Sequence, residues 1–105
     1  MYMKNSIDYK SRVDVCEILK AMAHPVRIEI IGLLSKENIK GLSVTQIHES
    51  LGLTQPETSK HLSIMRKNEV LDFVKNGGST YYFINKENPL SRCVVNCICK
   101  RLQIN

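Results

Sequence analysis

The sequence lacks the long apolar runs that membrane insertion and secretion require. Nowhere in its 105 residues does an apolar stretch approach the roughly 18 residues of a membrane span. The first twenty residues mix charged with apolar side chains and contain no apolar signal-peptide core. Low-complexity tracts are lacking as well, and 43% of the residues are hydrophobic, as in folded proteins. We therefore expect a single folded domain, residues 1–105, that is cytoplasmic and has no membrane partner.

The residue patterns of common enzymes are also missing. The sequence contains no evident nucleophile–base pair, glycine-rich phosphate loop or pair of suitably spaced carboxylates. A chain this small also leaves little room for a substrate pocket. We therefore predict that the protein is not an enzyme.

Acidic residues are the minority among the charged side chains. Ten Asp and Glu residues face fifteen Lys and Arg residues, which leaves a net charge of +5. That balance suits a polyanionic partner such as nucleic acid. A small chain buries more surface when it pairs with a copy of itself, so a homodimer is also expected.

Proline and glycine are few and divide the chain into short elements. Pro25 suits the first turn of a helix, Gly52 suits a helix end, and Asn76-Gly77 suits a tight hairpin turn. Together with the apolar periodicity, these breaks predict a mainly α protein with a small β-hairpin, in the order α-α-α-α-β-β-α. The expected helices are residues 8–23, 25–36, 44–51, 54–67 and 89–103, and the expected strands are residues 70–75 and 80–85.

The opening of the fourth helix is strongly marked. Thr54 and Glu57 have the spacing of a capping box, and Pro56 lies in the first turn, where its missing amide hydrogen needs no partner. Polar side chains such as Gln55 are expected to project outward from this helix. The short helix before it, the intervening turn and the following hairpin together predict a winged helix-turn-helix.

The segment LGLTQPETSKHLSIMRKNEVL resembles the ArsR/SmtB family of small bacterial winged-helix repressors. AMAHPVRIEIIGLL and the wing ending in TYYFIN resemble the same family, and the likeness covers roughly residues 15–85. The resemblance implies a homodimer formed through the first and last helices, residues 8–23 and 89–103. It also implies binding to double-stranded operator DNA, with release when an effector binds or oxidises the protein.

The resemblance further implies which side chains meet DNA. Glutamine can bind adenine through two hydrogen bonds, serine can contact several groups, and lysine suits guanine or phosphate. A winged helix used only for protein contacts would have a neutral or acidic face, whereas Arg66 and Lys67 are basic. For His61 a second interpretation stays open, in which its half-buried side chain packs against the preceding helix. The candidate DNA-binding residues are Thr54, Gln55, Thr58, Ser59, Lys60, His61, Ser63, Lys75 and Gly77.

The metal sites best known in the family are missing here. Its arsenic and cadmium site uses two cysteines at the start of the third helix, and this sequence has Ser43 and Thr45 at those positions. Neutral hydroxyls are poor ligands for soft metals. The family's zinc site needs histidine on the last helix, yet no histidine follows His61. Any metal sensing must therefore use other residues.

Four cysteines are the remaining candidates, and without a secretory signal they are expected to be thiols or ligands. Cys93 and Cys97 lie one helical turn apart, so both sulfurs can meet one soft ion. Cys99 lies about 200° further around the helix, so a third sulfur requires a frayed helix end, Cys16 or the other subunit. Three interpretations remain open: a thiophilic ion such as As(III) as effector, a redox or persulfide switch, and packing. No cofactor is expected for DNA binding itself.

Overall fold

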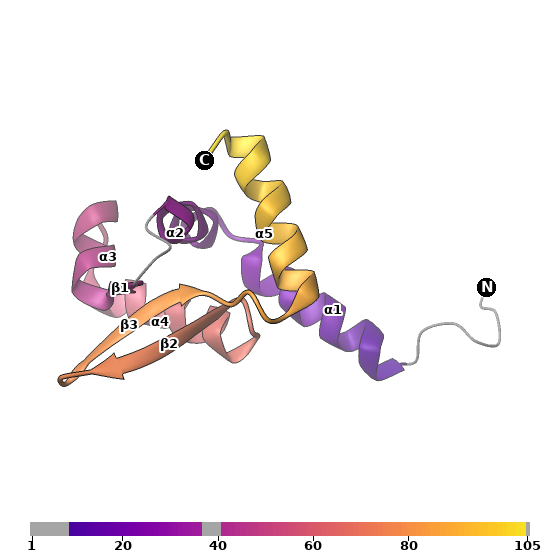
Figure 1. Ribbon diagram of the computed structural model, residues 1–105, viewed down its shortest axis with the longest axis horizontal. Coiled ribbons are helices and arrows are strands. Elements are labelled where there is room, and N and C mark those ends of the chain that lie inside the picture. Colours follow the sequence, from indigo (N-terminus) through magenta and orange to yellow (C-terminus); the bar gives the residue numbers. More distant parts are fainter. Residues whose placement is uncertain (1–8, 37–40, 105) are drawn as a thin grey trace.

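The computed structural model describes residues 9–36 and 41–104, which form five helices and a three-stranded antiparallel sheet (Figure 1). The helices are α1 (Tyr9–Met22), α2 (Pro25–Lys36), α3 (Val44–Leu51), α4 (Gln55–Lys67) and α5 (Pro89–Leu102). The strands are β1 (Leu42–Ser43), β2 (Leu71–Asn76) and β3 (Ser79–Ile84). No helix in this part of the chain is both long and apolar enough to cross a membrane.

The predicted fold class, mainly helical with a β-hairpin, is confirmed, and most element ends agree to within one residue. Asp8, the predicted first residue of the first helix, lies outside the described residues. Strand β1 was not predicted. It extends the sheet to the order β1-β3-β2, with Leu42 opposite Tyr82 and Ser43 opposite Tyr81. A strand of two residues is too short to show an alternating pattern in the sequence. Its partner strand is also distant in the sequence, so the pairing was not predictable from local residues.

The hydrophobic core lies where α2, α3 and α4 pack together and against the sheet. Helices α2 and α4 each bury several residues on one face, and α3 buries Ile47, so each helix has an inward and an outward face. The large apolar residues with almost no exposure are Ile30, Ile31, Leu34, Ile47, Leu62, Met65, Val70 and Leu71. Because this core takes side chains from both α3 and α4, it fixes the angle between these two helices.

Helices α1 and α5 keep apolar side chains in contact with solvent. In α1, Ile18 and Met22 are buried, whereas Val15 and Leu19 are 39% and 43% exposed. In α5, Leu102 is 48% exposed. Figure 1 shows α1 and α5 on the side of the molecule opposite α3 and the tip of the hairpin. Helices α1 and α5 therefore lie away from α3 and the hairpin tip.

Candidate nucleic-acid interface

Helix α3 is fixed at both ends by local hydrogen bonds. Ser43 Oγ accepts from Gln46 N at 3.2 Å, and Ser43 N donates to Gln46 Oε1 at 2.9 Å, which completes a capping box. This box was not predicted, although its Ser-x-x-Gln spacing is a readable signal. Gly52 ends the helix in a left-handed conformation, φ 69° and ψ 31°, which glycine adopts without a steric penalty. The turn at Gly52 then sets the direction of α4.

Thr54 is the N-cap of helix α4, as the predicted capping box implies. Thr54 Oγ1 accepts a hydrogen bond of 3.2 Å from Glu57 N, and Pro56 lies in the first turn. Within the described residues the Glu57 side chain makes no return bond to Thr54, so only half of the predicted capping box is present. The N-cap bond still satisfies one of the first backbone amides of the helix, which have no intrahelical acceptor. The first turn, which carries Gln55, is thereby held in place.

The outward face of α4 carries a row of polar side chains. Gln55, Ser59 and Ser63 are exposed and are spaced four residues apart. Four residues advance a helix by a little more than one turn, so these side chains lie along one face. Lys60 and Lys67 are exposed beside this row. Uncharged hydrogen-bonding groups flanked by cations are suited to base edges and phosphates.

Two residues predicted to contact DNA lie in the interior instead. Thr58 is 0% exposed, and its Oγ1 donates to the carbonyl of Thr54 at 2.9 Å. His61 is 7% exposed. Both belong to the face of α4 that also buries Leu62 and Met65. Because both side chains are buried, we leave Thr58 and His61 out of the proposed DNA-contacting set. His61 is buried, as in the alternative interpretation, but it contacts His24 and Arg27 at the start of α2 rather than the preceding helix α3.

His61 connects α4 to the beginning of α2. Its Nδ1 accepts a hydrogen bond of 3.1 Å from Arg27 Nε, and its ring centroid lies 4.6 Å from that of His24. Burial lowers the pKa of His61 below its ordinary value of about 6.5, and the nearby charges of His24 and Arg27 lower this pKa further. An imidazole nitrogen that accepts a hydrogen bond carries no proton, so the lowered pKa and the bond favour the same neutral form. Neutral His61 thereby ties the inner face of α4 to α2.

Arg66 links α4 to the hairpin. Its guanidinium carbon lies 4.9 Å from the ring centroid of Phe73 in β2, and the Phe73 ring lies 6.0 Å from that of Tyr82 in β3. A cation over an aromatic face is attracted by the ring quadrupole. This contact keeps an exposed positive charge between the helix and the hairpin. The sequence indicated Arg66 as a basic residue of this helix, but its contact with Phe73 joins two separate elements and was not predicted.

The hairpin ends in a two-residue turn at Gly77 and Gly78. Their φ angles of 61° and 86° are both positive, as a type I′ turn requires. Asn76 and Ser79 form the last pair of the ladder, so the turn is centred one residue later than the predicted Asn76-Gly77. Lys75 and Gly77 are exposed. The tip therefore offers one cation and an accessible backbone to a partner.

The cysteines of α5 face two different directions. Cys93 and Cys97 are exposed, as is Cys16 in α1, whereas Cys99 is half-buried and packs against the core. Because α5 stays helical through Leu102, Cys99 remains on the far side of the helix from Cys97. Within residues 9–36 and 41–104, no three His, Cys, Asp or Glu side chains lie together as a metal site. The predicted set of Cys93, Cys97 and Cys99 is thus not assembled within one protomer.

The order of α3, the Gly52 turn, α4 and the β2–β3 hairpin defines a winged helix-turn-helix protein. The family model described as bacterial regulatory protein, arsR family, matches residues 24–72, from the start of α2 into β2. The chain belongs to the ArsR family of bacterial regulatory proteins.

The transcriptional repressor PagR of Bacillus anthracis is similar to this chain. In sequence, 51 residues are 43% identical, which is 49% of this chain, and the match spans half (50%) of the curated relative's length. The crystal structure of PagR superimposes with a TM-score of 0.74 and 41% identity, covering 87% of this chain and 99% of that chain.

Two more distant structures share the fold. HlyU from Vibrio cholerae has a TM-score of 0.76 at 23% identity, with 90% of this chain and 97% of that chain covered. The protein Mb0332 from Mycobacterium bovis, described as a homodimeric winged helix-turn-helix DNA-binding domain, has a TM-score of 0.75 at 20% identity. That comparison covers 96% of this chain and 91% of that chain.

Proposed function

We propose that this protein is a homodimeric transcriptional repressor that binds double-stranded operator DNA through α4 and the β2–β3 hairpin. The row of Gln55, Ser59 and Ser63 carries the proposal, because it is exposed on a helix whose opposite face is buried. An α-helix fits the major groove, where such side chains can reach base edges. PagR is named a transcriptional repressor, which supports the same role for this chain.

Base reading and overall affinity are assigned to different side chains. Gln55 has the groups to bind adenine through two hydrogen bonds, whereas Lys60 on α4 and Lys75 near the wing tip suit phosphates. Phosphate contacts fix the orientation of the protein, and base contacts choose the sequence. The proposed DNA-contacting residues are Thr54, Gln55, Ser59, Lys60, Ser63, Lys75 and Gly77.

The second copy is proposed to pack against α1 and α5. Val15 and Leu19 of α1 and Leu102 of α5 are large apolar side chains left exposed in one protomer. Burial of such side chains drives association, at about 25 cal/mol per Å² of apolar surface removed from water. Two chains of +5 each give the dimer a charge of +10, which favours approach to DNA. A symmetric dimer would read an inverted repeat with half-sites about one helical turn apart, or a multiple of it.

The effector is proposed to be a thiophilic ion such as arsenite, bound by Cys93 and Cys97. Both thiols are exposed on α5, and residues four apart on a helix have Cβ atoms about 5–6 Å from each other. Thiolates are the preferred ligands of soft ions. Cys99 faces the core, so the third sulfur would come from Cys16 or from the second copy. An ion held on the proposed dimer helix would release DNA only if it bound the DNA-incompetent form more tightly.

Fluorescence anisotropy with a DNA site selected by the protein from a random pool tests the DNA assignment. Gln55→Ala and Ser59→Ala should each lose about 1–3 kcal/mol on the selected site and almost nothing on random DNA. Lys60→Ala should weaken both DNAs alike and flatten the dependence of affinity on salt. Ser50→Ala, an exposed serine on α3 outside the proposed contact set, is the control and should leave the affinity for both DNAs unchanged. If Gln55→Ala weakens binding to both DNAs equally, Gln55 does not contact bases.

A further inference from the structure

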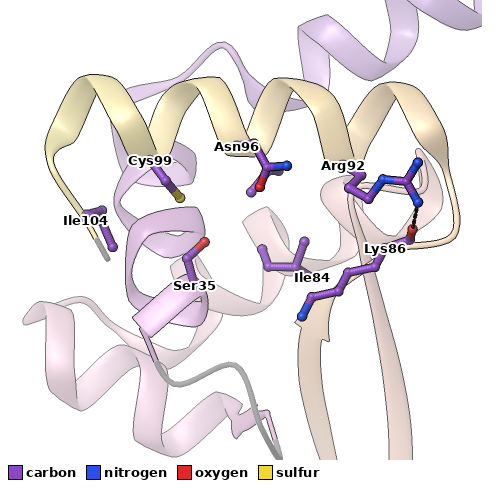
Figure 2. A pocket seen from close by; sticks show the side chains of 8 residues that line it. Ser35, Ile84, Lys86, Arg92, Asn96, Cys99 and Ile104 are labelled. Carbon is purple, nitrogen blue, oxygen red and sulfur yellow. Dashed lines mark hydrogen bonds between the residues drawn. The ribbon is translucent and has the colours of Figure 1, made fainter.

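A cavity of about 390 Å³ lies between α2, α5 and the end of β3, away from the outward face of α4. Figure 2 shows Ser35 of α2 and Ile84 of β3 on one side of it and Asn96 and Cys99 of α5 on the other. Binding pockets for small molecules typically have volumes of about 300–1,000 Å³. The cavity is therefore large enough for a small organic molecule.

One end of the cavity is positively charged. Lys86 and Arg92 line it there, and the Arg92 guanidinium uses one hydrogen bond, from Nη1 to the carbonyl of Lys86 at 3.2 Å, to hold its position (Figure 2). No acidic residue is among the described residues that line the cavity. A guanidinium presents several N–H donors in a plane, a geometry that matches a carboxylate. This end is suited to a small anionic group.

The other end contains a hydroxyl that lacks a partner. Ser35 Oγ is buried and makes no hydrogen bond within the part of the chain that the structure describes. In Figure 2 it points toward the Cys99 side chain, next to Ile104. Ile104 lines the cavity at this end and packs closely on α2, since its Cδ1 lies only 2.9 Å from the position that a Cβ on Gly32 would occupy. A buried polar group is normally hydrogen-bonded, so Ser35 is available to a polar atom of a bound molecule.

Apolar side chains also line the cavity. Ile84 and Val95 line it, and both are largely buried, at 6% and 4% exposure. Asn96 adds one amide from α5. The lining therefore combines two cations at one end, apolar side chains and the Asn96 amide between, and the Ser35 hydroxyl beside Cys99 at the other end.

We propose that this cavity binds an elongated carboxylate, with the carboxylate at Lys86 and Arg92, an aliphatic body over Ile84 and Val95, and a terminal hydroxyl at Ser35. The charge and the apolar lining select an anionic amphiphile, and the buried hydroxyl selects a second polar group at its far end. The proposal concerns ligand binding alone and does not rest on the DNA-binding function. The residues involved are separate from the exposed Cys93 and Cys97.

Isothermal titration of the full-length protein with four eight-carbon probes tests this proposal. The probes are octanoate, 8-hydroxyoctanoate, 1-octanol and octylammonium. Octanoate should bind saturably and at least about tenfold more tightly than 1-octanol or octylammonium, as expected for a charge-assisted hydrogen bond. The terminal hydroxyl of 8-hydroxyoctanoate should tighten binding further, by about threefold or more.

Matched variants locate the site. Lys86→Gln and Arg92→Gln should each weaken octanoate binding about tenfold, whereas Lys100→Gln makes the same charge change on α5 outside the cavity and should have no effect. Ser35→Ala should leave octanoate binding intact and abolish the preference for 8-hydroxyoctanoate. Equal binding of octanoate and octylammonium, no saturable binding, or unchanged binding in both charge variants would each overturn the proposal.

Discussion

The buried hydroxyl of Ser91 in α5 donates a hydrogen bond of 2.8 Å to the backbone carbonyl of Glu69. Glu69 lies between α4 and β2 in a left-handed conformation, φ 64°, and its carboxylate accepts a second bond of 2.8 Å from Asn88 Nδ2 at the start of α5. The N-terminal end of α5 is therefore bonded directly to the junction between α4 and the hairpin. This junction gives a physical route by which a change at the proposed dimer helix reaches the proposed DNA-binding elements.

Ser91→Ala should lower the free energy of unfolding by about 1–3 kcal/mol, because it removes a buried hydrogen bond and leaves the Glu69 carbonyl without that donor. Urea denaturation followed by circular dichroism measures the change. Ser50→Ala, an exposed serine on α3, is the control and should stay within about 0.5 kcal/mol of the unchanged protein. Equal stability of the two variants would show that the Ser91 bond contributes nothing.

Acidification should destabilise the fold through His61. The folded protein holds the pKa of His61 below 6.5, mainly by burial, whereas the unfolded chain takes up a proton near the ordinary value. The free energy of unfolding should therefore fall as the pH drops from about 7.5 through 6.5 toward the lower folded pKa, since the unfolded state binds more protons in that window.

Urea denaturation across that pH range checks the effect. His61→Gln lacks the titrating group and should show a shallower fall in stability, with a lower starting stability because the hydrogen bond from Arg27 is altered. His48→Gln removes an imidazole outside this cluster and controls for the chemical change. If the free energy of unfolding falls as steeply with pH in His61→Gln as in the wild-type protein, other groups cause the pH dependence.

Leu19→Glu should weaken the proposed dimer by at least about tenfold in dissociation constant, because burying a carboxylate in an apolar interface is unfavourable. Sedimentation at micromolar concentration should give twice the 12.0 kDa chain mass for the unchanged protein and a shift toward one chain for the variant. Val74→Glu introduces the same charge at a 49% exposed apolar position on the hairpin and should leave the mass unchanged. If the wild-type protein sediments as a monomer, the proposed interface is wrong.

Arsenite should reduce operator affinity by about 5- to 150-fold, the usual range of allosteric coupling, and Cys93→Ser with Cys97→Ser should remove this response. Cys99→Ser should retain it, because that thiol faces the core. Anisotropy titrations with arsenite and, separately, with a disulfide donor check the effect. Release of DNA by the disulfide donor and not by arsenite would indicate a thiol redox switch instead. No release by either agent would mean that Cys93 and Cys97 do not carry the signal.

The helices, the hairpin and most of their ends were predictable because their signals are local. Thr54 opens α4, Gly52 closes α3 and Pro89 lies in the first turn of α5, each through the backbone chemistry of one residue. Strand β1 was missed because its pairing with β3 depends on how distant segments meet. The contact between Arg66 and Phe73 was missed for the same reason.

The candidate site was less predictable, because polarity alone does not show which way a helical residue faces. Thr58 and Ser59 are adjacent hydroxyl residues, yet Thr58 is buried and bonded to its own helix while Ser59 is exposed. A hydroxyl can satisfy itself on the backbone and enter a core, so threonine and serine carry a weak burial signal.

By itself the sequence determined the class of fold, the caps and turns, and the polar residues available on α4, since these follow from residue type and spacing. Only the tertiary structure decided which of them reach solvent. Successive residues on a helix point about 100° apart, so the packing of α4 on the core hides Thr58 and His61 and leaves Gln55 and Ser59 exposed. The same geometry turns Cys99 toward α2 and leaves Cys97 outside, because the neighbouring helix covers one side of α5 and not the other.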